Sequence, residues 1–197
     1  MSSLLAGLSE YVVTIARSPE DLGLVMDVRR AVYVDEMRFR TAATLVDEFD
    51  SAATHFLVTV EGVAIGSARM VPGEMHLEGE VCFDISDWRK QGKVVEIGRL
   101  SVLPSYRRSL ASVALFRAFY RHALAGSIRF FFVTGAGHVD RLYRSLGFHS
   151  IDGPKWYEPC NNISKAYILD LDMALEDWGL RRPRMLEYFL EPMDGIG

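Results

Sequence analysis

The sequence predicts an α/β (α+β) fold: a single domain with a mixed, mostly antiparallel, twisted sheet and helices on both of its faces. Two neighbouring strand patterns, at residues 55–61 and 63–71, flank Gly62 and indicate an antiparallel hairpin. Farther along, strand and helix patterns alternate, which is typical of a parallel pair inside a sheet. A chain of 197 residues with 49% apolar content suits one domain with a sizeable core.

The first half of the chain begins with a strand pattern at residues 11–16, which a helix pattern follows. Ser18 suits the N-cap of this helix, Pro19 suits its first position, and acidic residues fill the first turn. Arg29 has the same helical spacing as the apolar residues, so we expect its side chain to point inward. The apolar residues with this spacing are Leu22, Val25, Met26, Val32 and Tyr33.

The second half alternates strands and helices that stop at glycine or proline. A short helix starts at Ser86, and the next strand ends before Pro104. The strand patterns lie at residues 94–102, 128–134 and 166–171, and the helix patterns at residues 110–125 and 138–146. We divide the chain into a main domain at residues 1–175 and a C-terminal helical extension or tail at residues 176–197.

Glu96 and Arg99 stand in a run, residues 94–102, that is otherwise suited to a buried strand. Burying either charge is unfavourable unless it is paired or used. Regular alternation sends the two side chains to opposite faces, whereas a bulge at Gly98 turns both toward the same side. We therefore expect Glu96 and Arg99 to share one cleft. The alternative is an edge strand with both charges in solvent.

Composition argues against several functional classes. A net charge of −4 disfavours a nucleic-acid partner. Cys82 and Cys160 make neither a disulfide framework nor a metal-binding spacing, and the histidines are isolated, so we expect no metal. Residues 1–10 lack the basic region of a signal peptide, and no apolar run approaches the roughly 18 residues of a membrane span. A cytoplasmic protein is expected.

Residues 142–148 read Leu-Tyr-Arg-Ser-Leu-Gly-Phe, and residues 104–108 read Pro-Ser-Tyr-Arg-Arg between a strand and a helix. These motifs resemble the Tyr-x-x-Leu-Gly-Phe ending and the pantetheine-binding turn of the GNAT superfamily of N-acyltransferases. The resemblance implies that residues 1–175 form a GNAT-like acyltransferase domain. Residues 109–112 lack the glycines that members using coenzyme A usually have after the arginine, so we expect another donor.

An ordered set of residues between positions 29 and 99 gives a narrower resemblance. The set is Arg29, Tyr33, Phe39, Asp47, Asp50, Arg69, Glu96 and Arg99. It resembles the signature of the acyl-homoserine-lactone (autoinducer) synthases, the long-chain N-acyl amino acid synthases and the ornithine N-acyltransferases. Tyr33 and Phe39 replace the Phe and Trp that help form the S-adenosylmethionine pocket of the lactone synthases, so the N-acyl amino acid synthases rank first. The resemblance implies no cofactor, because the donor substrate is an acyl-phosphopantetheine thioester on acyl carrier protein.

The chemistry of acyl transfer to an amine suggests a role for each residue. The amine must lose a proton, and a partly buried Glu96 with a raised pKa suits that step. Backbone amides opened by the bulge are suited to bind the oxyanion. We expect Glu96, Arg99 and Tyr143 to be catalytic, although Tyr143, which has the position of the GNAT thiolate acid, also suits a core aromatic. The expected acceptor-binding residues are Arg29, Tyr33, Phe39, Asp47, Asp50 and Arg69.

Within that set, we expect the arginines and the aspartates to have different roles. The arginines suit a carboxylate of the acceptor, which a guanidinium binds at two points. Asp47 and Asp50 hold those arginines, contact the acceptor's ammonium group, or form a solvated turn. The sequence leaves these three interpretations open.

Three surface features suggest partners. Arginines that follow the pantetheine-like turn suit an acidic acyl carrier protein, the alternative being scattered solvated charges. The expected carrier-binding residues are Arg107, Arg108, Arg117 and Arg121. Aromatic residues at positions 116–132 either line an acyl tunnel or fill the core. The tail at residues 173–193 offers a weak membrane-surface contact. Its apolar residues are Trp178, Leu180, Met185, Leu186, Tyr188, Phe189 and Leu190.

The favoured function is an N-acyltransferase that moves a long-chain fatty acyl group from acyl carrier protein to the amine of an amino acid. The alternatives are an acyl-homoserine-lactone synthase, an ornithine N-acyltransferase, and a non-catalytic GNAT-fold binding module. An inward-facing Glu96 with arginines nearby favours an enzyme over a binding module.

Overall fold

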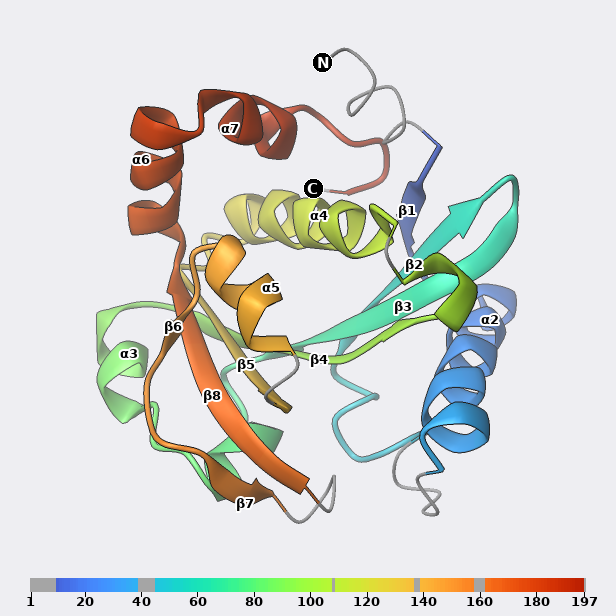
Figure 1. Cartoon of the computed structure of the whole chain (residues 1–197), viewed down its shortest axis with the longest axis horizontal. Helices are drawn as coiled ribbons and strands as arrows, with labels where there is room; N and C mark the ends of the chain where they lie inside the picture. Colours follow the sequence, from blue (N-terminus) through green and yellow to red (C-terminus); the bar gives the residue numbers. More distant parts are fainter. Residues whose placement is uncertain (1–9, 39–44, 108, 137–138, 158–161, 197) are drawn as a thin grey trace.

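The computed structural model describes residues 10–38, 45–107, 109–136, 139–157 and 162–196 (Figure 1). Within them, eight strands form one sheet in the order β1, β2, β3, β4, β5, β8 and β6, and β7 also pairs with β8. In this described part the pair β4 and β5 is parallel, and the other pairs are antiparallel. The predicted mixed, mostly antiparallel sheet is confirmed, with its parallel pair in the middle.

The strands are β1 (Val12–Ile15), β2 (Thr54–Val60), β3 (Val63–Pro72), β4 (Val94–Val102), β5 (Phe130–Ala136), β6 (His149–Ser150), β7 (Lys155–Tyr157) and β8 (Asn162–Asp170). The α-helices are α2 (Pro19–Arg29), α3 (Ser86–Gln91), α4 (Ala111–Ala125), α5 (Asp140–Ser145), α6 (Leu171–Arg181) and α7 (Pro183–Leu190). The other helical turns are η1 (Arg30–Glu36), η3 (Glu78–Val81) and η4 (Pro104–Tyr106). The short strands β6 and β7 are absent from the sequence prediction, because two or three residues give no measurable periodicity.

Helix α2 begins as predicted and then changes its geometry. The Ser18 side chain accepts a hydrogen bond from the Asp21 backbone N–H at 3.0 Å, and the Asp21 carboxylate accepts one from the Ser18 N–H. After Arg29 the chain continues as the π-helical turn η1. A π-helical turn widens the backbone and is frequent at functional sites. Here it carries Tyr33 and Glu36 to the rim of the pocket described below.

Both faces of the sheet are buried, which explains the continuous apolar runs in its strands. In β5, Phe131 and Val133 join the larger core cluster, whereas Phe130 and Phe132 join a second cluster on the opposite face. Helix α4 covers the larger cluster, and α3 and η3 lie on the other side of the sheet (Figure 1). The helices therefore lie on both faces, as the sequence predicts.

The C-terminal helices pack against α4 (Figure 1). Trp178 of α6 and Phe189 of α7 each lie 4.9 Å, centroid to centroid, from the ring of Tyr120 in α4. Both side chains, and that of Tyr188, are buried in the larger core cluster. The core covers these aromatic side chains, whereas Leu180 is 78% exposed, so the expected membrane contact of the tail stays a prediction. The boundary at residue 175 remains a prediction. No described helix combines the length and the apolar character needed to cross a membrane.

The parallel strands β4 and β5 separate partway along their length. Their pairing covers Val94–Glu96 of β4 and Phe130–Phe132 of β5 and stops there, although both strands continue. The divergence opens the middle of the sheet immediately after Glu96. Residues from the separated ends of both strands line the pocket that forms in this gap.

Candidate active site

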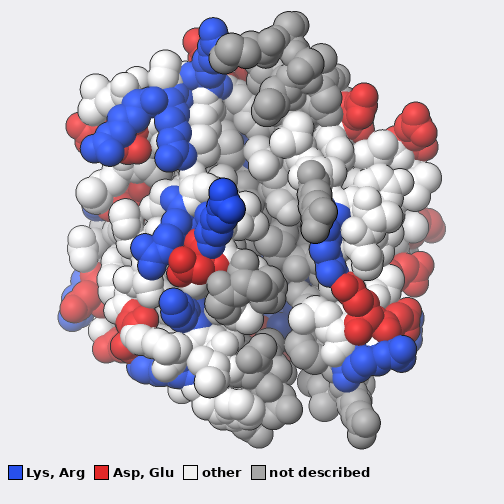
Figure 2. Space-filling view, viewed as in Figure 1, with Lys and Arg blue, Asp and Glu red and all other residues white. Residues whose placement is uncertain are grey.

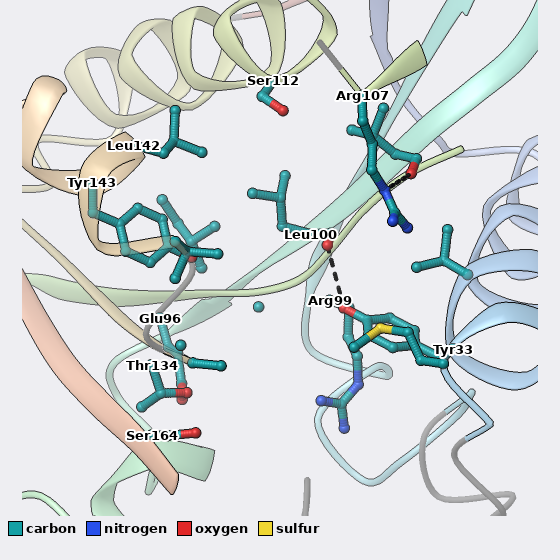
Figure 3. Close-up of a pocket in the computed structure, with 18 of the residues that line it drawn as sticks. Tyr33, Glu96, Arg99, Leu100, Arg107, Ser112, Thr134, Leu142, Tyr143 and Ser164 are labelled. Atoms are coloured by element: carbon teal, nitrogen blue, oxygen red, sulfur yellow. Dashed lines mark hydrogen bonds between the residues drawn. The ribbon is translucent and has the colours of Figure 1, made fainter. Parts of the chain in front are cut away.

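The pocket occupies about 610 Å³ between the separated strands (Figure 3). It is bordered by η1, the η3 loop, β4, the start of α4, the end of β5 and α5. The polar side chains that line it are Tyr33, Glu36, Glu78, Glu96, Arg99, Arg107, Ser112, Thr134, Tyr143 and Ser164. A pocket of this volume is large enough for a small-molecule substrate.

A bulge in β4 turns Arg99 into this pocket. Ser101 pairs with Ser67 of β3, and Gly98 pairs with Arg69, so Arg99 and Leu100 together face the single residue Ala68. Arg99 has a backbone φ of 51°, a left-handed conformation that is strained for a residue with a side chain. The side chains of Glu96 and Arg99 extend to the same side of β4 (Figure 3). The predicted shared cleft and bulge are both present, and the bulge lies one residue beyond Gly98.

Glu96 is an almost fully buried carboxyl group, with 4% of its surface exposed. The backbone N–H of Gly79 donates to both of its oxygens, at 3.1 and 3.3 Å. Burial raises the pKa of Glu96 to about 8, and the nearby charge of Glu78 acts in the same direction. A carboxyl group with such a pKa changes its protonation state close to neutral pH, as a general base for an amine requires.

The loop that carries Glu78 and Gly79 is held firmly in place. A side chain at position 79 would come within 2.5 Å of the Phe132 ring, so only glycine lets the loop lie this close to β5. On the far side of the loop, Arg89 donates to the Glu80 carboxylate at 3.0 Å and to the Met75 carbonyl at 2.9 Å. These contacts fix the Gly79 N–H against Glu96.

The raised pKa of Glu96 has a consequence for stability. Ordinary carboxyl groups of this type have a pKa of 4.5, so between pH 4.5 and about 8 the unfolded chain has lost a proton that the folded chain keeps. The contribution of protonated Glu96 to the free energy of unfolding is therefore fully present below pH 4.5, and it is lost as the pH rises toward 8. We expect the free energy of unfolding to fall by at least about 1 kcal/mol across this range relative to a Glu96→Gln variant. Urea titrations of both proteins at pH 5 and pH 9 measure this difference, and parallel curves would contradict it.

Beside Glu96, two arginines and two carboxylates form interlocking ion pairs. Arg69 donates to Asp47 at 2.5 Å and, through its other terminal nitrogen, to Glu78 at 2.9 Å. Arg99 donates to Asp47 at 2.6 Å and to Glu78 at 3.2 Å. Each carboxylate thus joins the same two guanidinium groups, which is the arrangement that makes buried charges tolerable. Asp47 is therefore an arginine partner and not part of a solvated turn.

A second layer of pairs lies behind the first. Arg29 is fully buried and donates to Asp50 at 2.8 Å and to the Leu45 carbonyl at 2.9 Å. Asp50 also lies 3.0 Å from Arg69 and so connects the two layers. His55 accepts from Arg29 through Nδ1 and donates to the Asp50 carbonyl through Nε2, and burial lowers its pKa, so its ring is neutral. Arg29, Asp47, Asp50, Arg69, Glu78, Glu96 and Arg99 are called the charged cluster below.

Two tyrosines face each other across the pocket (Figure 3). Tyr33 donates its hydroxyl hydrogen to the Leu100 carbonyl at 3.3 Å, which ties η1 to the bulge. Tyr143 projects from α5 into the pocket, and its ring packs at 5.1 Å from that of Tyr167. Burial raises the pKa of Tyr143 well above its ordinary value, so it stays protonated and able to donate a proton. Tyr143 is both a core aromatic and a pocket residue.

The structure separates the predicted acceptor-binding residues into two groups. Tyr33 lines the pocket, as do Glu96, Arg99 and Tyr143 of the predicted catalytic set. Arg29, Asp47, Asp50 and Arg69 lie behind that lining and bind one another. Arg29 and Arg69 bind protein carboxylates and do not line the pocket, and the expected contact of either one with the acceptor stays a prediction. Phe39 and Arg108 lie outside the described residues.

The structure also separates the predicted carrier-binding arginines, with one at the pocket and two beside the C-terminal segment. Arg107 lines the pocket and forms a two-point ion pair with Glu36. Arg117 instead donates to Glu191 at 3.1 Å and stacks on Tyr188, and Arg121 donates to the Leu190 carbonyl at 2.9 Å. These contacts hold the C-terminal segment against α4, and the assignment of the two arginines to a carrier stays a prediction. On the face drawn in Figure 2, Lys and Arg side chains lie beside Asp and Glu side chains and form no continuous basic surface.

The aromatic residues at positions 116–132 are core and not an acyl tunnel. All of them are at least 98% buried, and none belongs to the pocket lining. The sequence analysis missed Glu78, Gly79 and His55. His55 and Glu78 are lone residues with no motif around them, and the single available signal is the glycine that follows Glu78. The described residues contain no group of three or more side chains able to hold a metal ion.

Comparison with known proteins agrees with this geometry. Residues 28–117 match the model of the acetyltransferase (GNAT) domain. FeeM, an N-acyl amino acid synthase from uncultured soil microbes, superposes with a TM-score of 0.75 at 19% identity, over 84% of this chain and 93% of that chain. BjaI, a coenzyme A-dependent acyl-homoserine lactone synthase, gives 0.65 at 17% identity, over 95% and 91%.

LasI, an acyl-homoserine lactone synthase, gives a TM-score of 0.61 at 15% identity, over 82% of this chain and 90% of that chain. No curated protein matches the chain. At these identities the superpositions establish a shared fold, and the match to the GNAT domain covers residues 28–117 of the 197. The chain therefore has the fold of the GNAT acyltransferases.

Proposed function

We propose that this protein is an N-acyltransferase that moves a long-chain fatty acyl group from acyl carrier protein to the amine of an amino acid. One observation carries the proposal: Glu96 is a buried carboxyl group with a raised pKa, and it borders a pocket at the point where β4 and β5 separate. The pocket also contains a guanidinium group and a protonated tyrosine. The pocket thus offers a different residue for each role: Glu96 as the base, Arg99 as the contact with the acceptor and Tyr143 as the acid.

In the proposed reaction, the acceptor enters as an ammonium ion and transfers one proton to ionised Glu96. The resulting amine attacks the thioester carbonyl, a C–N bond forms, and the C–S bond breaks. The leaving thiolate takes a proton from Tyr143, which regains one from the nitrogen of the new amide through the pocket. We assign stabilisation of the oxyanion to backbone N–H groups at the irregular strand edge between Ile97 and Leu100.

Arg99 is the group we assign to the acceptor's carboxylate. It lies in the pocket lining, 11% exposed, whereas Arg29 and Arg69 lie behind the lining. Its backbone strain and its ion pairs with Asp47 and Glu78 hold the guanidinium in one orientation. Such preorganisation favours a two-point contact with an incoming carboxylate.

The donor assignment to acyl carrier protein rests on the turn before α4. This turn has no glycine at residues 109–112, so its backbone is less able to approach a pyrophosphate closely. An acyl-phosphopantetheine arm has no pyrophosphate, so it needs less of this close approach by the backbone. The cytoplasmic location expected from the sequence suits a carrier-dependent reaction.

Purified protein tests the function directly. It is incubated with acyl carrier protein or coenzyme A thioesters of several chain lengths and with single amino acids, and the products are identified by mass spectrometry. The proposal expects N-acyl amino acids with the carrier thioester as the better donor. Efficient use of acyl-coenzyme A alone would overturn the donor assignment, and the absence of any acylated amino acid would overturn the acceptor class.

The same assay tests the principal alternative, an acyl-homoserine-lactone synthase. The superposition on BjaI over 95% of this chain favours testing it. Adding S-adenosylmethionine as the acceptor distinguishes the two, because an acyl lactone and an N-acyl amino acid differ in mass.

A further inference from the structure

Glu78 is a buried carboxylate that borders the pocket and belongs to no sequence motif. One of its oxygens binds Arg69 at 2.9 Å and the other binds Arg99 at 3.2 Å. It therefore supplies negative charge to Arg99 in the pocket lining and to Arg69 behind it. An incoming carboxylate has to share Arg99 with Glu78 and Asp47.

The charged cluster has more acids than bases. Its three guanidinium groups face four carboxyl groups, and Glu96 accepts its hydrogen bonds from the backbone N–H of Gly79. Once Glu96 is ionised, as acyl transfer requires, the cluster carries one net negative charge. Electrostatic interactions are strong at buried sites, so a charge imbalance of this size favours a cation over a second anion.

The rest of the described pocket lining does not reverse this imbalance. Arg107, the other guanidinium in the lining, is matched by Glu36. Thr134 and Ser164 lie near Glu96 and are uncharged (Figure 3). The side of the pocket that holds Glu78 and Glu96 thus presents carboxylate oxygens and hydroxyl groups, which suit an ammonium ion.

We propose that Glu78 is a specificity-determining residue, which together with Glu96 forms an ammonium subsite that admits neutral and basic amino acids and rejects those with a second carboxylate. The acceptor's single α-carboxylate shares Arg99, whereas a side-chain carboxylate meets Glu78 or Glu96 without a matching cation. This inference rests on the proposed function and deepens it by naming the acceptor class.

The first test compares isosteric acceptors in the transfer assay. For the wild-type protein, kcat/KM with glutamine is expected to exceed kcat/KM with glutamate at least tenfold, and asparagine and aspartate should show the same order. In Glu78→Gln, which keeps an acceptor oxygen for the arginines, the glutamine-to-glutamate ratio is expected to fall at least threefold. Glu74→Gln makes the same change at an exposed position in the preceding turn and should keep the wild-type ratio.

The second test is independent of acyl transfer. Calorimetry measures binding of n-butylammonium and of butanoate to the full-length protein without donor. The wild-type protein should bind n-butylammonium more tightly than butanoate, for which Arg99 is the shared contact. Glu78→Gln should weaken n-butylammonium binding while Glu74→Gln does not. This result without any acylated amino acid would overturn the proposed function and support the subsite.

The outcomes against the subsite are equally distinct. Wild-type protein that acylates glutamate as well as glutamine overturns the inference while the proposed function stands. This comparison needs no variant, so it remains decisive if Glu78→Gln does not fold. A Glu78→Gln protein that folds, acylates amino acids and keeps the wild-type ratio also overturns it.

Discussion

Glu96→Gln is expected to lower kcat/KM for acyl transfer by roughly 10² to 10⁴, the usual contribution of a general base. Gln is close to Glu in shape, and its oxygen can still accept the Gly79 N–H, so the loop and pocket should keep their geometry. What is lost is a group able to take the acceptor's proton. Binding of the acyl carrier thioester should change little, because the base lies on the acceptor side of the reaction.

Initial rates with a saturating thioester, together with calorimetric carrier binding, separate these two effects. Glu187→Gln, at an exposed position on α7, is the matched control and should retain wild-type rates. A Glu96→Gln protein with near wild-type turnover would remove Glu96 from proton transfer. A parallel loss of carrier binding would point to a damaged pocket instead.

The fold was predictable because its signals are local and periodic. Ser18 and Pro19 mark the start of α2, Gly62 marks the hairpin, and the apolar run of β5 reflects burial on both faces. The bulge in β4 was also predictable, since two charges in a buried strand are tolerable only if the backbone re-aims one of them. Those arguments use the strand's own residues and need no knowledge of its neighbours.

Ion pairs and hydrogen bonds between residues far apart in the sequence were not predictable in this way. Arg29 is correctly predicted to point inward and Arg99 to share a cleft with Glu96, but the sequence does not say whether a substrate or the protein supplies the opposing carboxylate. Glu78 supplies a protein carboxylate to Arg69 and Arg99. It lies in a short helical turn with no periodic pattern, so the sequence does not reveal this contact. Arg117 and Arg121 look like a basic helix face in the sequence, whereas their partners are backbone and side-chain groups some 70 residues away.

The charged cluster affects both the stability of the fold and the chemistry proposed for the pocket. The same ion pairs that neutralise Arg69 and Arg99 also set the charge around Glu96. A variant in this cluster therefore changes both the free energy of unfolding and the chemistry of the pocket. Substitutions in the second layer, away from the pocket lining, isolate the structural part of that effect.

Arg69→Met is expected to produce the largest loss of stability, about 3–5 kcal/mol in the free energy of unfolding. Arg69 is 1% exposed and contacts Asp47, Asp50 and Glu78. Methionine fills part of the space and leaves these carboxylates facing one another without their shared cation. Urea denaturation near neutral pH measures the loss. Arg181→Met, which removes a solvent-exposed pair with Asp177 on α6, should change stability by less than about 1 kcal/mol.

A double variant shows whether this loss comes from unpaired charge or from poorer packing. Adding Glu78→Gln to Arg69→Met removes one of the unpaired carboxylates, so the double variant should be more stable than Arg69→Met by at least about 1 kcal/mol. Glu78→Gln alone should destabilise the wild-type protein, since it takes a charged partner from the buried Arg69 and from Arg99 in the pocket lining. The sign of the same substitution thus depends on whether Arg69 is present. If Glu78→Gln lowers stability equally in both backgrounds, the two side chains are not coupled and the cluster is held together by packing alone.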